Sequence, residues 1–367
     1  MLVGIDASRA IADRPTGTET YSRRLIQGLL ACDSGHRLRL YFRQPPPEGL
    51  FSGSEQRVLS FPRLWTHLRL SWEVARHPPQ VLFVPAHVIP LLHPCPTLVT
   101  VHDLGYLCYP DAHPWRQRLY LDLSTRWNAH TATHLLADSQ ATRSDLVGRY
   151  GVPPNKITVA YPGIDEFLRP VQEIASIAAA KARYNISGDY FLYLGTLQPR
   201  KNLVRLVKAF ARFAADHPAY PVQLVLAGKR GWLDDDLTRE VERQGLGERV
   251  IFPGYISGDD KAPLLTGALA FVFPSLYEGF GLPVLEAQAC GCPVITSTTS
   301  SLPEIAGDAA LLVDPEDTAA IAAAIECIAT QPRVREQLVE RGFANARRFS
   351  WKSCVETVFS VLDHHFC

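Results

Sequence analysis

Two glutamates, Glu278 and Glu286, flank a glycine-rich turn in the stretch EGFGLPVLE. The apolar run Ala268–Phe273 before it predicts a buried strand, and Pro283 favours a helix that runs to about Cys290. Backbone amides in the first turn of such a helix bind an anion, above all a phosphate. A carboxylate instead accepts two hydrogen bonds from neighbouring sugar hydroxyls. Two carboxylates beside a phosphate site therefore indicate a nucleotide sugar, in which a diphosphate joins ribose to hexose. The alternative, for either glutamate alone, is a solvated surface charge.

Two cations, Arg200 and Lys201, lie in a second loop, GTLQPRKNL, which directly follows the predicted strand Tyr190–Leu194. They fall where the next helix begins, and the helix dipole disfavours cations at that end. Arginine offers a fork for phosphate oxygens and lysine a point charge. The loop therefore predicts a bound anion, and the alternative is a pair of solvated surface cations.

The first half of the chain offers weaker candidates. Gly17 opens a predicted helix after the strand Leu2–Ile5, where backbone amides can cover a diphosphate. His102 directly follows the predicted strand Thr97–Val101, at the end where parallel sheets bind ligands. A lone histidine is usually structural, and the position of His102 at the carboxyl end of a strand is the argument for a role in the site.

Strand-like and helix-like segments alternate twice along the chain, which predicts an α/β fold of two doubly wound, Rossmann-like domains facing across a cleft. We expect residues 1–165 to form the first domain and 166–187 a connector. Residues 188–349 are expected to form the second domain, and 350–367 a helix that returns to the first. The predicted strands are Leu2–Ile5, Leu38–Phe42, Val58–Phe61, Val81–Val84, Thr97–Val101, His134–Ala137, Ile157–Ala160, Tyr190–Leu194, Val222–Ala227, Arg249–Phe252, Ala268–Phe273, Pro293–Thr296 and Ala310–Val313.

Composition narrows the class of protein. The 37 basic residues equal the 37 acidic residues, so no overall charge attracts nucleic acid, and none is expected as a partner. The eight scattered cysteines are typical of reduced thiols in a cytosolic protein, and the amino terminus resembles no secretion signal, which predicts a cytoplasmic location. No metal or other cofactor is expected: Cys290 and Cys292 lack a second pair, and the acidic run 234–236 begins a helix, where acids are favoured anyway.

These loops together resemble the retaining GT-B glycosyltransferases of family 4. The segment Glu278–Glu286 is similar to that family's E-x7-E signature, and Gly195–Leu203 to its phosphate loop. Further similarities, spread over residues 1–350, are Val101-His102-Asp103, Ala137-Asp138-Ser139 and Tyr161-Pro-Gly-Ile-Asp165. One departure is Thr16-Gly17, where many relatives have two glycines.

The resemblance assigns roles to individual residues. It implies that Glu286 binds the ribose, that Glu278 contacts the donor sugar, and that His102 touches that sugar near its 6-hydroxyl. Arg200 and Lys201 would hold the diphosphate. The remaining donor contacts would come from backbone amides, at Gly17, Phe280, Gly281 and Leu282.

The implied reaction moves a hexose, with mannose favoured, from a GDP- or UDP-linked donor to a glycan, lipid-linked or other hydroxyl acceptor, with retained configuration and no metal. We expect the leaving phosphate to accept the acceptor's proton. A sugar phosphorylase of the same fold would use nearly the same residues, and a non-catalytic nucleotide-sugar-binding protein is a further alternative. A dinucleotide oxidoreductase is disfavoured, because no G-x-G-x-x-G fingerprint follows either first strand.

One further stretch, Arg63–Trp72, bears on the acceptor. Leu64, Trp65, Leu68 and Trp72 fall near one face of a predicted amphipathic helix, with basic residues elsewhere. Such a helix either lies on a membrane, which would make the protein peripheral to the inner face of the cell membrane, or packs its apolar face on the first domain.

Overall fold

The computed structural model describes residues 1–12, 17–86, 88–110, 113–229, 231 and 235–367, and it divides into two compact units. Unit 1 comprises Met1–Gly163 and Phe349–Cys367, and unit 2 comprises Ile164–Arg348. The segment expected to be a connector thus groups with unit 2, and the last helix groups with unit 1. Thr16 and Asp234 lie outside the described residues.

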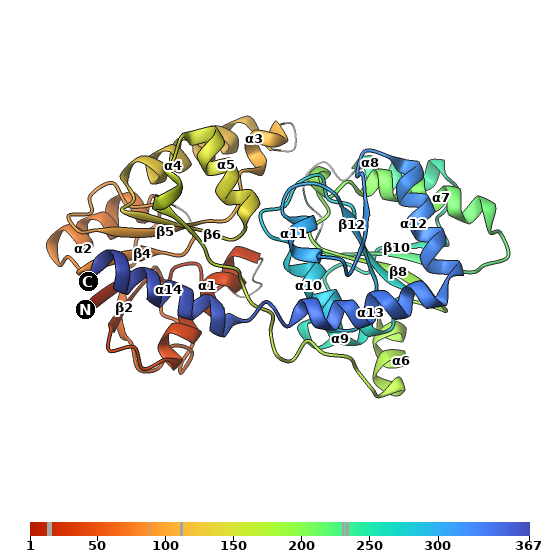
Figure 1. Cartoon of the computed structure of the whole chain (residues 1–367), viewed down its shortest axis with the longest axis horizontal. Helices are drawn as coiled ribbons and strands as arrows, with labels where there is room; N and C mark the ends of the chain where they lie inside the picture. The colour runs from red at the N-terminus through yellow and green to blue at the C-terminus, as the bar shows by residue number, and fades with distance from the viewer. Residues whose placement is uncertain (13–16, 87, 111–112, 230, 232–234) are drawn as a thin grey trace. The chain divides into compact units, whose positions relative to one another are not determined.

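Unit 1 is built on a seven-stranded parallel sheet in the order β3-β2-β1-β4-β5-β6-β7 (Figure 1). Its strands are β1 (Leu2–Asp6), β2 (Arg37–Phe42), β3 (Glu55–Val58), β4 (Val81–Val84), β5 (Thr97–Val101), β6 (His134–Ala137) and β7 (Ile157–Val159). Its helices are α1 (Gly17–Ala31), α2 (Ser71–Arg76), α3 (Gly105–Cys108), α4 (Trp115–Thr131), α5 (Gln140–Tyr150) and α14 (Trp351–Phe366). A π-helical turn (Thr66–Leu70) precedes α2, and a 3-10 turn (Pro154–Lys156) precedes β7.

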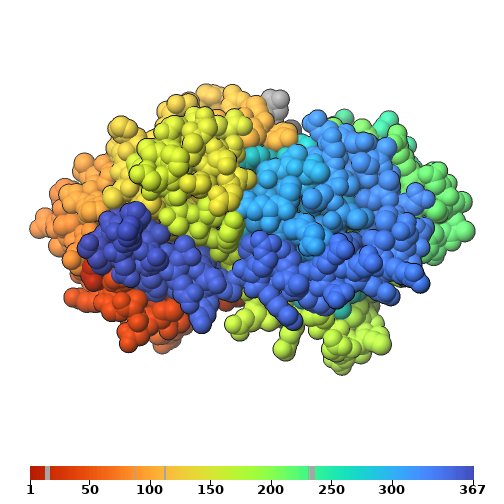
Figure 2. All heavy atoms as spheres, viewed as in Figure 1, coloured from red at the N-terminus to blue at the C-terminus, as the bar shows by residue number. Residues whose placement is uncertain are grey.

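The two faces of this sheet bury separate apolar clusters because successive side chains of a strand point to opposite sides. In β4, Val81 and Phe83 join the cluster that contains α1 and α14. Leu82 and Val84 join the cluster that contains Trp65 and α5. Figures 1 and 2 show α14, in dark blue, on the surface of unit 1 beside α1, so the end of the chain completes the first core.

Unit 2 repeats the design with a six-stranded parallel sheet in the order β10-β9-β8-β11-β12-β13. Its strands are β8 (Tyr190–Leu194), β9 (Gln223–Ala227), β10 (Val250–Ile251), β11 (Ala270–Phe273), β12 (Val294–Ser297) and β13 (Leu311–Val313). Its helices are α6 (Ile174–Arg183), α7 (Leu203–Asp216), α8 (Asp235–Arg243), α9 (Gly258–Thr266), α10 (Leu282–Ala289), α11 (Leu302–Ala306), α12 (Thr318–Thr330) and α13 (Pro332–Ala346). A 3-10 turn (Pro199–Lys201) precedes α7. The α/β class and the two parallel, doubly wound sheets predicted from the sequence are confirmed.

Two local predictions were wrong. The strand expected at Val58–Phe61 lies at Glu55–Val58, because β3 is an exposed edge strand with little apolar pattern to mark it. The helix expected through Arg63–Trp72 begins only after Leu64, whose φ of 53° is left-handed, and consists of the π-helical turn followed by α2. As a result Trp65 is buried, with its indole N–H donating to the Leu59 carbonyl oxygen, while Leu64, Leu68 and Trp72 are exposed.

Candidate active site

The predicted donor loops of unit 2 meet at the point where its strand order reverses. β8 has β9 on one side and β11 on the other, so the connections after β8 and β11 leave in different directions, and ligands of such sheets bind there. The Leu276 amide donates to the Arg200 carbonyl oxygen at 2.9 Å. The Asn202 side-chain amide donates to the carbonyl oxygens of Pro274 and Pro315, at 3.1 and 2.7 Å. Backbone and side-chain hydrogen bonds therefore tie the loops together.

Lys201 and Glu278 form a buried ion pair within this junction. The Lys201 Nζ lies 2.5 Å from Glu278 Oε1, and the two residues are only 8% exposed. The ammonium also lies 4.8 Å from the ring centre of Phe273, a cation–π contact. The predicted need for an anion beside Lys201 is therefore met within the chain by Glu278, which the sequence analysis had placed on the sugar.

Hydroxyl groups from the loop after β12 hold the turn that carries Glu278. The Glu278 amide donates to Ser300 Oγ at 2.9 Å, and Ser301 Oγ lies 3.0 Å from the Glu278 carbonyl oxygen and 2.6 Å from that of Phe280. Ser300 itself has a left-handed backbone, with φ of 54°. The sequence analysis missed these serines, although a polar run directly after a buried strand was a signal for them.

The glycine-rich turn ends in the helix that the sequence predicted, shifted by one residue to Leu282–Ala289. Gly281, the N-cap of this helix, has a backbone φ of 112°, which residues other than glycine rarely adopt. Phe280 is buried, and Leu282 is the first helical residue. Arg200 lies on the facing loop and donates from Nη1 to the Tyr277 carbonyl oxygen at 3.1 Å. Amides and cation thus belong to one junction of loops.

Glu286 has a partner that the sequence analysis did not name. Its carboxylate forms an ion pair with the Lys261 ammonium, which projects from the neighbouring helix α9. Both side chains are partly exposed, Lys261 by 29% and Glu286 by 16%. Glu286 and Glu278 are thus each paired with a lysine, but from different elements. Lys261 lies in an acidic first turn, after Asp259 and Asp260, and carries no motif of its own.

In unit 1, His102 follows β5 and lies between groups that follow the two neighbouring strands, β4 and β6. Its Nδ1 is 2.6 Å from Asp138 Oδ2, after β6, and its Nε2 is 2.9 Å from the Pro85 carbonyl oxygen, after β4. Burial opposes a charge on the ring, but the Asp138 carboxylate outweighs it and raises the pKa of His102 above its usual value. For Asp138 the effect of burial is the larger one, and it raises the pKa of this carboxyl even though His102 acts to lower it. His102 therefore belongs to an acid–imidazole pair in which the carboxylate is buried and the ring is partly exposed.

Gly17 is the exposed first residue of α1. One helical turn later, the Tyr21 ring makes a T-shaped contact with the His102 ring, with 4.8 Å between their centres. The helix that Gly17 opens is therefore anchored beside His102, and a Cβ at Gly17 itself would meet no atom of the described residues within 4 Å.

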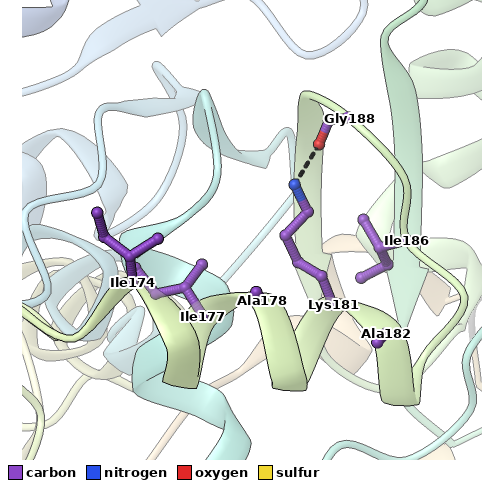
Figure 3. Close-up of a pocket in the computed structure, with 7 residues that line it drawn as sticks. All are labelled: Ile174, Ile177, Ala178, Lys181, Ala182, Ile186 and Gly188. Carbon is purple, nitrogen blue, oxygen red and sulfur yellow. Dashed lines mark hydrogen bonds between the residues drawn. The ribbon is translucent and has the colours of Figure 1, made fainter.

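A pocket of about 340 Å³ lies elsewhere in unit 2, along α6 (Figure 3). Ile174, Ile177 and Ile186 line it, and Lys181 donates from Nζ to the Gly188 carbonyl oxygen at 2.5 Å. Gly188 precedes β8, whereas the loop with Arg200 and Lys201 follows that strand. The pocket is thus at the opposite end of the strand from the predicted donor site.

The described residues contain neither a membrane-spanning helix nor a cluster of metal ligands. None of their helices combines the length and apolar character that crossing a bilayer requires. Among the same residues, no three or more histidine, cysteine, aspartate or glutamate side chains cluster as metal ligands do. All eight cysteines carry free thiols.

Comparison with known proteins extends these findings. The model of the group 1 glycosyl transferases matches residues 178–344, and that of Glycosyltransferase Family 4 matches residues 15–166. The O-antigen chain mannosyltransferase B of Escherichia coli is 36% identical over 259 residues, which are 70% of this chain and 67% of that protein. The serotype-specific mannosyltransferase WbdA of Escherichia coli is 28% identical over 70% of this chain, but the match spans only 32% of WbdA.

Solved structures agree on the fold. Anabaena Alr3699/HepE in complex with UDP-glucose has a TM-score of 0.78 at 18% identity, with 99% of both chains covered. WaaG, a glycosyltransferase involved in lipopolysaccharide biosynthesis, has a TM-score of 0.77 at 16% identity, covering 99% of this chain and 100% of that one. The chain belongs to the family 4 glycosyltransferases of group 1, as a mannosyltransferase-like member with the GT-B fold.

Proposed function

We propose that this glycosyltransferase moves mannose from GDP-mannose to a hydroxyl of a growing polysaccharide, with retained anomeric configuration and without a metal ion. The observation that supports the donor site is the junction of the β8 and β11 loops, where Arg200 and Lys201 contact the segment that leads into α10. The mannosyl group is supported by the two mannosyltransferases named above, one of which acts on the O-antigen chain.

The chemistry follows from charge. Cleavage of the bond between the anomeric carbon and the diphosphate oxygen leaves positive charge on the sugar and negative charge on the phosphate. Arg200, Lys201 and the amides at Gly281 and Leu282 are held in place before that charge develops, so they stabilise it without reorganising. The acceptor oxygen then bonds to the anomeric carbon, and its proton passes to a leaving-phosphate oxygen. Because lysine and arginine supply the positive charge, the proposal requires no metal.

The Lys201–Glu278 pair gives this proposal a specific form. A diphosphate that approaches Lys201 adds a second anion beside an ammonium that Glu278 already neutralises. We propose that Lys201 then bridges phosphate and Glu278, which leaves the second carboxylate oxygen of Glu278 to accept a hydroxyl of the sugar. Glu286, similarly held by Lys261, accepts the ribose hydroxyls.

The test is a binding and turnover screen of GDP-mannose, UDP-glucose and UDP-N-acetylglucosamine in the presence of a metal chelator. We expect GDP-mannose alone to raise the melting temperature, and Lys201→Met and Glu286→Gln to abolish the rise. Lys181→Met, in the pocket at the other end of β8, is the matched control and should retain it. Proton NMR of the glycoside product reads its anomeric configuration.

Other outcomes would replace the proposal. Release of mannose 1-phosphate that requires inorganic phosphate would identify a phosphorylase. Donor binding without turnover for any acceptor would identify a binding protein, and stabilisation by a UDP-sugar instead would change the donor.

We further propose that the acceptor is lipid-linked and that unit 1 meets it at an anionic membrane surface. Five large apolar side chains of unit 1 are each at least half exposed, and we call them the exposed apolar strip: Leu64, Leu68, Trp72, Leu91 and Leu92. The two segments that carry these side chains are adjacent, because the Leu92 amide donates to Ser71 Oγ, next to Trp72 in the sequence.

Charge favours an anionic lipid surface over another occupant of this strip. Residues 59–96 contain Arg63, Arg69 and Arg76 but a single acid, Glu73. Glu73 is buried and ion-paired with Arg69 and His77, so basic side chains dominate around the exposed leucines and tryptophan. Amphipathic surfaces of this composition bind the interface of anionic bilayers.

Co-sedimentation with phosphatidylglycerol vesicles tests the membrane proposal. We expect binding that weakens with salt and that Trp72→Ser with Leu92→Ser removes, while the donor-induced stabilisation remains. Trp115→Ser, an exposed tryptophan outside the strip, is the control. Failure to bind vesicles, with the double variant instead dissociating a dimer, would assign the strip to a second copy of the chain.

A further inference from the structure

The imidazole of His102 lies between two groups that accept hydrogen bonds. Nδ1 is 2.6 Å from Asp138 Oδ2, and Nε2 is 2.9 Å from the Pro85 carbonyl oxygen. A backbone carbonyl only accepts, and so does an ionised carboxylate, whereas a neutral imidazole carries a single N–H. Both contacts are therefore hydrogen bonds only if the His102 ring and the Asp138 carboxyl together carry two protons.

Two arrangements satisfy that count. Either His102 carries both protons and Asp138 is ionised, or Asp138 is protonated and donates to Nδ1. The ordinary pKa of an imidazole lies about 2.6 units above that of an aspartic acid, which favours the proton on the ring. The neighbouring Asp103 carboxylate favours a positive ring further.

Within the described part of the chain, the other titratable groups that act on the pair supply no competing positive charge. Tyr21, from α1, and Cys354, from α14, are buried, and burial raises the pKa of each, so both are neutral in the physiological range. Asp138 Oδ1 is buried and receives no hydrogen bond from the described residues. A carboxylate in that position depends on the ring's charge, because an unpaired buried charge is costly.

The local sequence explains why Asp138 is available for this role. Asp138 and Ser139 stand together before the helix that follows β6, and both residue types commonly cap helices. In the structure Ser139 alone is the N-cap of α5, and its Oγ accepts from the Thr142 amide at 3.1 Å. Thr142 in turn donates from Oγ1 to the His102 carbonyl oxygen at 3.2 Å, so the cap also fixes the backbone that carries the ring.

We propose that Asp138 is a positioning residue that holds His102 as an imidazolium, so that the ring presents a fixed positive charge and no proton acceptor. Its ligand would be an oxygen-rich group, such as sugar hydroxyls or phosphate. A ring that already carries both protons is unable to take the acceptor's proton, so the leaving phosphate remains the base. This last consequence, unlike the protonation state itself, rests on the proposed function.

Nitrogen NMR of the full-length protein with isotope-labelled histidine tests the protonation state without any substrate. The His102 signal is assigned by its loss in His102→Gln, since the chain has 12 histidines. We expect both ring nitrogens to show protonated shifts at neutral pH. In Asp138→Asn, one nitrogen should become unprotonated at the same pH. Asp103→Asn removes a nearby charge but no hydrogen bond to the ring. It should therefore lower the pKa of His102 less than Asp138→Asn does. An unprotonated Nδ1 in the wild-type protein would overturn the proposal.

The pH dependence of transfer gives a second readout, with a sign that separates the two roles. A required imidazolium loses activity as the pH rises through its raised pKa, whereas a general base loses activity as the pH falls. We expect an alkaline limb that moves to lower pH in Asp138→Asn, with kcat about tenfold lower on the alkaline side. Asp6, whose burial raises its pKa to about 6, can shape the acid limb, so only the alkaline limb is diagnostic. If no donor supports transfer, the proposed function fails while the NMR result still decides the state of His102.

Discussion

The charged groups of the two units are arranged in opposite ways. In unit 2, Lys201 pairs with Glu278 and Lys261 with Glu286, so each carboxylate that we assign to a sugar already has a cation from another element. In unit 1, both nitrogens of His102 are engaged by groups that neighbouring strands hold in place. A ligand that binds in unit 2 must therefore share existing ion pairs, whereas unit 1 offers a charge that is already fixed. Substitutions in the two ion pairs, at a buried histidine and at two helix caps would break or sharpen this contrast.

Lys201→Met should have the largest effect. It leaves Glu278 buried without its cation, and loss of one partner of a buried pair costs about 3–5 kcal/mol of unfolding free energy. Transfer should fall more than about a hundredfold, because a cation beside the developing phosphate charge is gone. Urea unfolding and an initial-rate assay measure the two effects.

A double variant tests whether the pair itself is responsible. Lys201→Met combined with Glu278→Gln removes both charges and should recover part of the lost stability but none of the activity. Lys181→Met, the same substitution where the lysine donates to a carbonyl oxygen, should cost about 1 kcal/mol or less. Strictly additive losses at positions 201 and 278 would show that the ion pair is not coupled.

His134 should make unit 1 sensitive to acid. Burial lowers its pKa to about 4, assisted by His365, whose ring stacks on it at 4.0 Å, and by Lys156 and His364. The unfolded chain therefore takes up a proton near pH 6.5, before the folded one does, and stability is lost as the pH falls from there to about 4. The difference between those pKa values corresponds to a loss on the order of 3 kcal/mol.

The measurement compares wild-type protein with His134→Gln by urea unfolding across this range. The comparison is needed because Asp6, with its pKa raised to about 6, stabilises the folded state as the pH falls. His130→Gln, at the exposed end of α4, serves as the control. An unchanged pH dependence in His134→Gln would show that His134 is not responsible.

Lys261→Met should affect binding more than stability. The Lys261–Glu286 pair is partly exposed, so its loss should change the unfolding free energy by less than about 1 kcal/mol. We expect the dissociation constant for GDP to rise about tenfold, because Glu286 loses the cation that orients it, a change of about 1.4 kcal/mol. Calorimetric titration measures it. The control is Arg183→Met, which breaks another ion pair to α9 and should leave the affinity for GDP unchanged. Tighter GDP binding by Lys261→Met would contradict the prediction and would mean that Lys261 competes with the ribose for Glu286.

Helix caps should give the smallest effects, one in each unit. Asp317 accepts from the amides of Ala319 and Ala320 at the start of α12, and Ser350 accepts from that of Ser353 at the start of α14. Replacement of either by alanine should cost about 1 kcal/mol. Asp317→Ala should lower the melting temperature of unit 2, and Ser350→Ala that of unit 1. Intrinsic fluorescence and the loss of donor binding on heating measure these transitions. Equal shifts of both transitions would show that the units unfold as one.

Sequence reasoning succeeded where a pattern is repeated along many residues. The strands at Val81–Val84, Thr97–Val101 and Tyr190–Leu194 were predicted to the residue, because buried parallel strands are short apolar runs between turns. It failed at Glu55–Val58, where an edge strand has exposed polar residues, and at Leu64, where a left-handed residue interrupts a regular apolar pattern. It also gave no sign that Leu119 and Leu123, at helical spacing in α4, are more than half exposed while the polar Thr125 and Asn128 are buried.

The sequence by itself determined the class of fold, the family and the loops that carry the donor-site residues, since these depend on periodicity and on motifs within one segment. Only the tertiary structure decided which charge meets which. Lys201 and Glu278 are 77 positions apart, and His102 and Asp138 are 36 apart, and each pair meets because parallel strands bring their carboxyl ends to the same edge of a sheet. Lys261 became visible only in the structure, for the physical reason that pairing between separate elements leaves no trace in the local order of residues.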